Sequence, residues 1–123
     1  MEQTQRETLE QIVSWILAKK GENLVTIDVK EKSDFADFLI ICHGTAELHV
    51  RAIGQHIIDM AKEAELHVLH SEGMKSGSWV LIDFGDIIVH IFTEKTRDYY
   101  RLEELWNVNA DSKKKFELSH ATS

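Results

Sequence analysis

Apolar residues near the N-terminus repeat with the spacing of one helical face. Leu9, Ile12, Val13, Ile16 and Leu17 follow the pattern i, i+3, i+4, i+7 and i+8. Thr4 and Glu7 have the spacing of a capping box, and Gly21 lies where a helix of this length would end. The pattern therefore predicts an amphipathic helix that packs one face against the rest of the domain.

Strands and further helices are predicted along the rest of the chain. Residues 24–29 alternate between apolar and polar, and residues 37–43 are a nearly continuous apolar run, typical of a strand buried on both faces. The pattern predicts strands over 24–29, 37–43 and 67–69, a helix from 45 to about 65, a hairpin over 78–92 and a helix from about 95 to 106. Thr45 is the predicted N-cap of the longer helix. This order predicts an α/β fold with a mixed β-sheet and flanking helices in a single domain.

The predicted hairpin is the most informative segment, because both of its faces are largely apolar. Gly85-Asp86 lies between two β-branched and aromatic runs, which predicts a two-residue turn with a positive φ at Gly85 and pairs Phe84 with Ile87. One face holds Val80, Ile82, Phe84, Ile87, Val89 and Ile91, and the other holds Trp79, Leu81, Asp83, Ile88, His90 and Phe92. The first face is typical of a core.

The second face, with its carboxylate and imidazole among large apolar side chains, allows two interpretations. Helices that cover both sides of the sheet explain it, and this is the commoner arrangement. A protein-binding surface also explains it, because the face is too apolar for solvent and too polar for an ordinary core. Asp83 and His90 are diagonal neighbours that can form a hydrogen bond. A structural role for that pair is favoured, because no nucleophile or oxyanion hole accompanies it.

Composition and charge narrow the classes of function. The single cysteine, Cys42, lies in an apolar run and is predicted to be a buried free thiol. With neither a membrane-length apolar run nor a secretory signal, we expect a soluble, cytoplasmic protein with no membrane partner. The net charge is −7, and the one basic cluster, Lys113–Lys115, lies in residues 107–123, which we expect to be a polar, flexible tail. This balance argues against direct nucleic-acid readout and favours a basic protein partner.

The sequence predicts no metal site and no cofactor. Of the seven histidines, His67 and His70 are predicted on opposite faces of a strand, and His49 and His56 lie two turns apart on a helix. None of these spacings is typical of a metal centre. A small anion at the helix start at Gly44–Thr45 stays open, although a single glycine is a weak signal for it.

Four motifs follow one another along the chain. They are DFLIICHGT at Asp37–Thr45, EG at Glu72–Gly73, WVLIDFGDIIVHIF at Trp79–Phe92 and RDYYRLEELW at Arg97–Trp106. This combination resembles the Iojap family, the ribosomal silencing factors. The resemblance runs from about residue 4 to 106, so we interpret residues 1–106 as the family domain and leave only residues 107–123 outside it.

The resemblance implies a translation factor that is not an enzyme. The family binds the large ribosomal subunit through large-subunit ribosomal protein fourteen, which is basic, and blocks joining of the small subunit, which represses translation in nutrient-poor conditions. Its interface lies on the sheet and includes the tryptophan of the Glu-Gly…Trp motif, here Trp79. The shared hairpin face adds Leu81, Asp83, His90 and Phe92, and the last motif adds Arg97 and Tyr100. The last two residues have the alternative role of holding the final helix to the sheet.

The family's fold resembles that of nucleotidyltransferases, so a metal-dependent nucleotidyltransferase is the alternative function. Such enzymes hold two metal ions on carboxylates that are typically spaced i, i+2 on a strand. The only acidic pair with that spacing, Glu63 and Glu65, lies near the end of a predicted helix. The sequence therefore predicts the fold without the activity. We further predict that the free protein dimerises through its apolar face.

Overall fold

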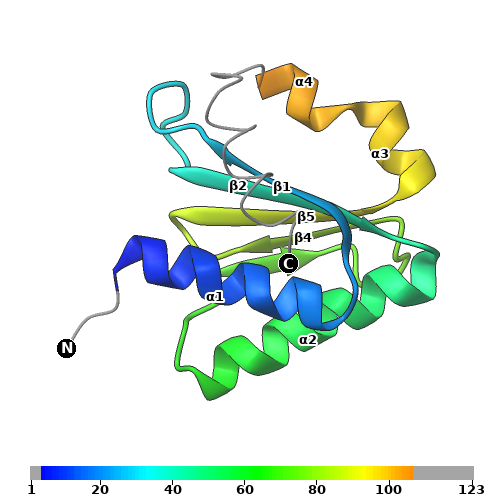
Figure 1. Cartoon of the computed structure of the whole chain (residues 1–123), viewed down its shortest axis with the longest axis horizontal. Coiled ribbons are helices and arrows are strands. Elements are labelled where there is room, and N and C mark those ends of the chain that lie inside the picture. The colour runs from blue at the N-terminus through cyan, green and yellow to red at the C-terminus, as the bar shows by residue number, and fades with distance from the viewer. Residues whose placement is uncertain (1–3, 107–123) are drawn as a thin grey trace.

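The computed structural model describes residues 4–106 and places a five-stranded sheet between two layers of helices (Figure 1). The strands are β1 (Glu22–Asp28), β2 (Phe38–Gly44), β3 (His70–Glu72), β4 (Trp79–Asp83) and β5 (Ile87–Thr93). The helices are α1 (Gln5–Ala18) and α2 (Glu47–Glu63) on one face, and α3 (Glu94–Tyr100) and α4 (Leu102–Trp106) on the other. This arrangement confirms the predicted α/β domain with a mixed sheet. The predicted tail lies outside the described residues.

The strands lie in the order β1-β2-β5-β4-β3. Strands β2 and β5 run parallel, and all other neighbours are antiparallel. The β4–β5 hairpin has the predicted register, since Trp79 pairs with Phe92 and the Phe84 N–H donates to the Ile87 carbonyl at 2.9 Å. Gly85 has the predicted positive φ, +97°. The turn residues are therefore sufficient to predict which hairpin side chains share a face.

Apolar side chains fill the space on both sides of the sheet. The larger cluster, under α1 and α2, joins Leu9, Ile12, Val13 and Ile16 to Val80, Ile82, Val89 and Ile91. The smaller cluster, on the side of α3 and α4, contains Val25, Ile27, Leu39, Ile41 and Phe92, with Trp79, Ile88 and Leu102 packed against it. Strand β2 is buried on both faces as predicted, because it is an inner strand between β1 and β5 and one of these clusters covers each of its faces. The first interpretation of the second hairpin face, cover by helices, is therefore correct for much of that face.

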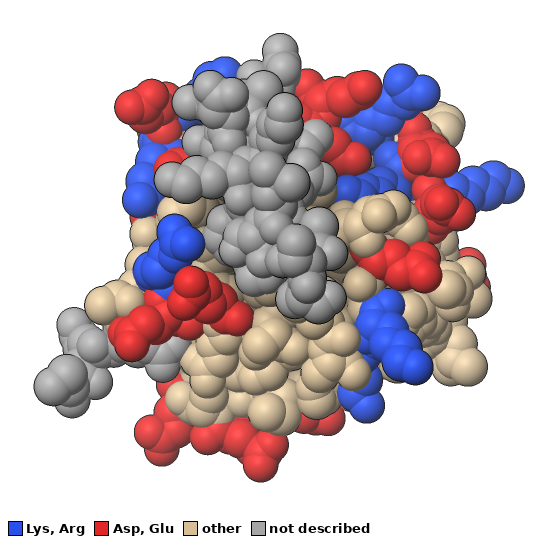
Figure 2. All heavy atoms as spheres, viewed as in Figure 1, with Lys and Arg blue, Asp and Glu red and all other residues tan. Residues whose placement is uncertain are grey.

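Charged side chains of both signs lie around the rim of the molecule, with an uncharged area in the lower part of the view (Figure 2). Acidic and basic side chains are mixed along that rim rather than separated into halves. Within residues 4–106, no helix is long and apolar enough to cross a membrane.

Helix α1 has the predicted capping box. The Glu7 N–H donates to Thr4 Oγ1 at 3.1 Å, and the Thr4 N–H donates to Glu7 Oε1 at 2.9 Å. The hydrogen bonds from Thr4 lower the pKa of the Glu7 carboxyl. Trp15, which flanks the predicted stripe, is buried as well. The capping residues and the helical period thus predict the helix, and the packing around it adds one residue to its buried face.

Helix α2 is capped one residue later than predicted. Its N-cap is Ala46, so the prediction that Thr45 caps this helix is wrong. The reason is His49, whose Nδ1 accepts the Thr45 N–H at 2.9 Å while its Nε2 lies 2.7 Å from the Lys19 carbonyl oxygen. The ring therefore joins the end of α1 to the start of α2. It also occupies the Thr45 amide, which an anion at this helix start would need.

Two other elements differ from the prediction. The short strand comprises His70–Glu72 instead of residues 67–69, because residues 70–72 are the ones that pair with β4. The final helix is broken at Arg101, whose φ of 47° is left-handed. The Arg101 N–H donates to the Arg97 carbonyl at 2.8 Å, which closes α3. A residue other than glycine in this conformation leaves no signal in the apolar pattern.

Candidate protein-binding face around Trp79

Trp79 begins strand β4 on the side of the sheet where α3 and α4 lie. Its ring packs on Phe92, its cross-strand partner, with centroids 5.0 Å apart, and on Tyr100 of α3, with centroids 4.7 Å apart. Phe92 is fully buried, Trp79 is half-buried and Tyr100 is 51% exposed. The three rings therefore lead from the core to the surface. A large aromatic side chain supported in this way is typical of a residue that anchors a protein interface.

The polar edge of Trp79 is bound to a buried histidine. Trp79 Nε1 donates a hydrogen bond to His90 Nδ1 at 3.0 Å. His90 is 8% exposed, and burial lowers its pKa to about 4, so the ring is neutral at neutral pH. The predicted bond between Asp83 and His90 is wrong, because Asp83 Oδ1 accepts the Gly85 N–H at 2.7 Å. Asp83 stabilises the hairpin turn instead.

A groove of about 550 Å³ lies beside Trp79. Its lining residues are Ser78, Trp79, Lys95, Thr96, Asp98, Tyr99 and Tyr100. Tyr99 is 80% exposed and meets Tyr100 edge-on, with centroids 4.9 Å apart. The break at Arg101 separates α3 from α4, so Tyr99 and Leu102 do not lie on one continuous helix. Tyr99 is thus an exposed aromatic residue of the groove that the sequence pattern did not identify.

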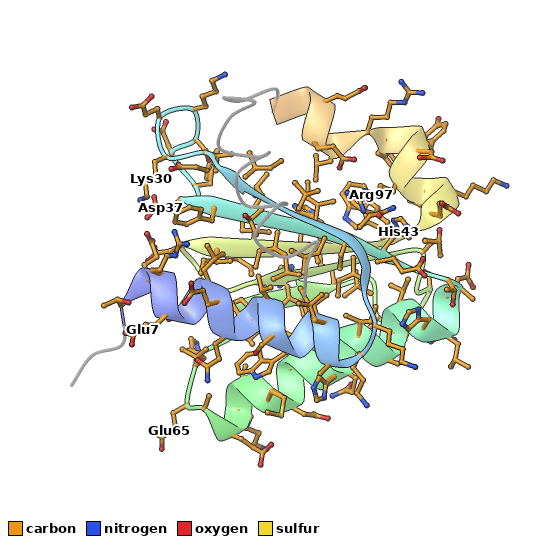
Figure 3. The ribbon with its side chains drawn as sticks, viewed as in Figure 1. Glu7, Lys30, Asp37, His43, Glu65 and Arg97 are labelled. Atoms are coloured by element: carbon orange, nitrogen blue, oxygen red, sulfur yellow. The ribbon has the colours of Figure 1, made fainter. Side chains whose placement is uncertain are left out.

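Arg97 is the buried residue of α3 and is only 7% exposed. Its Nη1 donates to the Asn23 carbonyl at 2.7 Å and to His43 Nδ1 at 3.0 Å, and its Nε donates to Glu103 Oε1 at 3.2 Å. Burial, reinforced by the Arg97 charge, lowers the pKa of His43, which favours the neutral ring that can accept this bond. Figure 3 shows Arg97 pointing to His43 from α3. The contacts favour the alternative role of Arg97, which is to hold the last helices to the sheet.

Gly73 explains the Glu-Gly…Trp motif in physical terms. Its φ is +86°, and a Cβ at this position would lie 1.9 Å from the Trp79 carbonyl oxygen. Only glycine fits without a shift of the backbone. The Gly77 N–H donates to the Gly73 carbonyl at 2.9 Å, which closes the turn before β4. The glycine therefore lets the preceding loop pass directly over the backbone that carries Trp79.

The seven residues predicted for the interface divide into two groups. Trp79, Leu81 and Asp83 alternate along β4 and are half-buried, and Tyr100 is exposed. His90, Phe92 and Arg97 are buried. The first group can contact a partner directly, whereas the second supports it from below. The role of all seven in binding stays a prediction.

Among residues 4–106, no group of three or more His, Cys, Asp or Glu side chains is placed to hold a metal ion. Glu65 follows α2 with a left-handed φ of 60° and lies at the opposite end of that helix from His43 (Figure 3). Cys42 is the predicted buried thiol, and burial raises its pKa to about 12, which suppresses the reactive thiolate.

Comparison with known proteins identifies the family. The sequence profile of the family described as "Ribosomal silencing factor during starvation" matches residues 2–123. A ribosomal silencing factor from Halalkalibacterium halodurans is 41% identical over 101 residues, which cover 82% of this chain and 86% of the relative. The chain belongs to the family of ribosomal silencing factors. This confirms the resemblance in the four sequence motifs.

Two further proteins extend the likeness between this chain and known proteins. A crystal structure of a protein from Chromobacterium violaceum has a TM-score of 0.84 and 29% sequence identity, and the match covers 87% of this chain and 89% of the other. A mouse protein named mitochondrial assembly of ribosomal large subunit protein 1 is 25% identical over 105 residues, which cover 83% of this chain and 46% of the mouse protein. The crystal structure supports the fold, and the name of the mouse protein refers to assembly of the large ribosomal subunit.

Proposed function

We propose that this member of the family binds the large ribosomal subunit and blocks joining of the small subunit. The proposed contact is the basic large-subunit ribosomal protein fourteen, and the proposed result is repression of translation in the cytoplasm when nutrients are scarce. Membership of the family supports this function. The name of the mouse relative, which refers to the large subunit, agrees with it.

The observation that carries the proposal is the aromatic surface at the start of β4. Trp79, Tyr99 and Tyr100 line one groove, and large aromatic side chains dominate the energy of protein interfaces. Two carboxylates accompany them, since Asp98 lines the groove and Asp83 is half-buried on the same strand as Trp79. Carboxylates beside exposed aromatic rings suit a partner that presents lysine or arginine.

The nucleotidyltransferase alternative gains no specific support from the structure. Helix α2 has 17 residues, so Glu63 at its end lies about 25 Å along the axis from the segment at Gly44–Thr45. A catalytic pair of carboxylates would have to face that segment. We therefore propose a regulatory function without a chemical step, carried by surface contacts alone.

Co-sedimentation with purified large and small ribosomal subunits tests the proposal. Trp79→Glu should leave the domain folded and weaken large-subunit binding by about 2 kcal/mol or more, which is about 30-fold in affinity. Phe35→Glu is the matched control, because Phe35 is 86% exposed in the connection between β1 and β2 and does not line the groove. A folded Trp79→Glu variant that binds the large subunit as tightly as the unmodified chain would refute the assignment of this surface.

We also propose that the free protein dimerises through this surface and exchanges that contact for the ribosome. Tyr99 and Tyr100 expose aromatic area beside the carboxylate of Asp98 and the ammonium group of Lys95, so the groove offers both charges to a second copy. Light scattering should show a dimer for the unmodified chain and a monomer for Tyr99→Glu. A monomer at high protein concentration would rule the dimer out.

A further inference from the structure

The bond between Trp79 and His90 is the only side-chain hydrogen bond that the structure shows on the Trp79 indole among residues 4–106. His90 pairs with Leu81 across the hairpin, so it lies diagonally opposite Trp79 on the same face. Its ring is also stacked with Phe92, at an interplanar angle of 10° and a centroid distance of 6.1 Å. The imidazole is thus held by its neighbours and presents Nδ1 to the indole.

The chemistry of the bond defines the state of the histidine. An indole N–H can only donate, so His90 Nδ1 must be the unprotonated acceptor and the neutral ring carries its proton on Nε2. Burial disfavours the charged ring, and the acceptor is therefore present at neutral pH. A protonated imidazole or an apolar side chain at this position would leave the indole N–H without this partner.

The hydrogen bond to His90 fixes the orientation of the Trp79 indole, which the ring contacts alone cannot do. Phe92 and Tyr100 pack on Trp79 with tilts of 35° and 47°, and such contacts tolerate sliding and rotation of the ring. A hydrogen bond of 3.0 Å is directional and sets which edge of the indole faces the sheet. The opposite edge and the exposed part of the ring are thereby directed to the groove.

We propose that His90 is a positioning residue of the ribosome-binding surface, which accepts the Trp79 N–H and so holds the indole as a wall of the groove before a partner arrives. The inference rests on the proposed function. A side chain that is already in its bound orientation loses less conformational freedom on binding, so the bond strengthens the interface although His90 itself touches no partner.

Two substitutions of His90 separate the acceptor from the packing. His90→Leu keeps apolar volume but removes the acceptor, whereas His90→Asn places its Oδ1 at the same number of bonds from Cα as Nδ1. His90→Leu should shift the Trp79 indole N–H resonance in ¹⁵N spectra and weaken large-subunit binding about fivefold, the effect of one net hydrogen bond. His90→Asn should retain the resonance and most of the binding. Trp79→Phe assigns the signal among the three tryptophans.

Controls make each outcome decisive. Val89→Ala lies on the same strand but the other face, fully buried, and should lose stability without losing affinity at equal folded concentration. Equal losses for Val89→Ala and His90→Leu, or for His90→Asn and His90→Leu, would overturn the positioning role. If Trp79→Glu loses binding and a folded His90→Leu does not, only the positioning role of His90 is refuted. If neither variant loses binding, the proposed binding surface is refuted as well. Should His90→Leu not fold, a Trp79 indole N–H in the unmodified chain that exchanges as fast as an exposed indole overturns the inference.

Discussion

Replacing Arg97 with leucine removes the group that joins the last two helices to the sheet. The guanidinium contacts the Asn23 carbonyl in β1, His43 in β2 and Glu103 in α4. The side chains of Arg97 and Glu103 are 9% and 19% exposed, so this pair is screened far less than a surface pair. We expect Arg97→Leu to destabilise the whole domain and not only the helix that carries it.

The size of the effect follows from the groups left behind. Breaking a buried ion pair by removal of one partner costs about 3–5 kcal/mol. Glu103 Oε2 already has no hydrogen-bond partner among the described residues, and the substitution would also remove the partner of Oε1. In the double variant Arg97→Leu/Glu103→Leu the unpaired carboxylate is gone, so we expect it to recover about 1–3 kcal/mol.

Urea unfolding followed by circular dichroism measures these differences. Arg6→Leu is the control, because the Arg6–Glu10 pair has side chains 68% and 55% exposed and such pairs contribute about 0–1 kcal/mol. An NMR titration of His43 adds a second readout, since loss of the Arg97 charge should raise the pKa of His43. An Arg97→Leu variant within about 1 kcal/mol of the unmodified chain, with an unchanged His43 pKa, would refute the anchoring role.

Two further predictions concern the turn before β4 and the response to acid. Gly73→Ala places a Cβ 1.9 Å from the Trp79 carbonyl oxygen at a φ of +86°. We therefore expect this variant to lose more than about 1 kcal/mol of stability and to change the fluorescence of Trp79. Unchanged stability and fluorescence would contradict the close approach. Burial lowers the pKa of His90 from its ordinary value of 6.5 to about 4, so the unfolded chain binds the extra proton first. Stability should therefore fall as pH drops from about 6.5 to 4, by about 3 kcal/mol from His90, and a flat urea midpoint between pH 7 and 5 would contradict this.

The sequence predicts those elements whose signals are local. The capping box at Thr4 and Glu7 and the turn at Gly85 involve residues three or fewer apart, and the structure shows both as predicted. The break at Arg101 is different, because a left-handed arginine has no compositional signature. The three-residue strand β3 is likewise defined only by its pairing with β4, and no short apolar pattern can reveal such a partner.

In the candidate site, too, local sequence signals predict some features, and other features depend on distant parts of the chain. The period of the hairpin predicts that Trp79, His90 and Phe92 share a face, and they do. It does not predict which of them reach the surface, because α3 comes from later in the chain and covers part of that face. Nor does it predict the Trp79–His90 bond, since the choice between Asp83 and Trp79 as the partner of His90 depends on rotamers and not on register.

The two interpretations of the apolar face prove compatible, because the cover that α3 and α4 provide is partial. Arg97 docks α3 against the sheet, in which Phe92 and His90 are buried, yet the short helix ends at Tyr100 and leaves Trp79 half-buried beside it. A longer cover would bury Trp79 completely, and no cover would leave its ring without support. We therefore expect changes that loosen α3 to weaken ribosome binding through Trp79, even where no residue of the groove is altered.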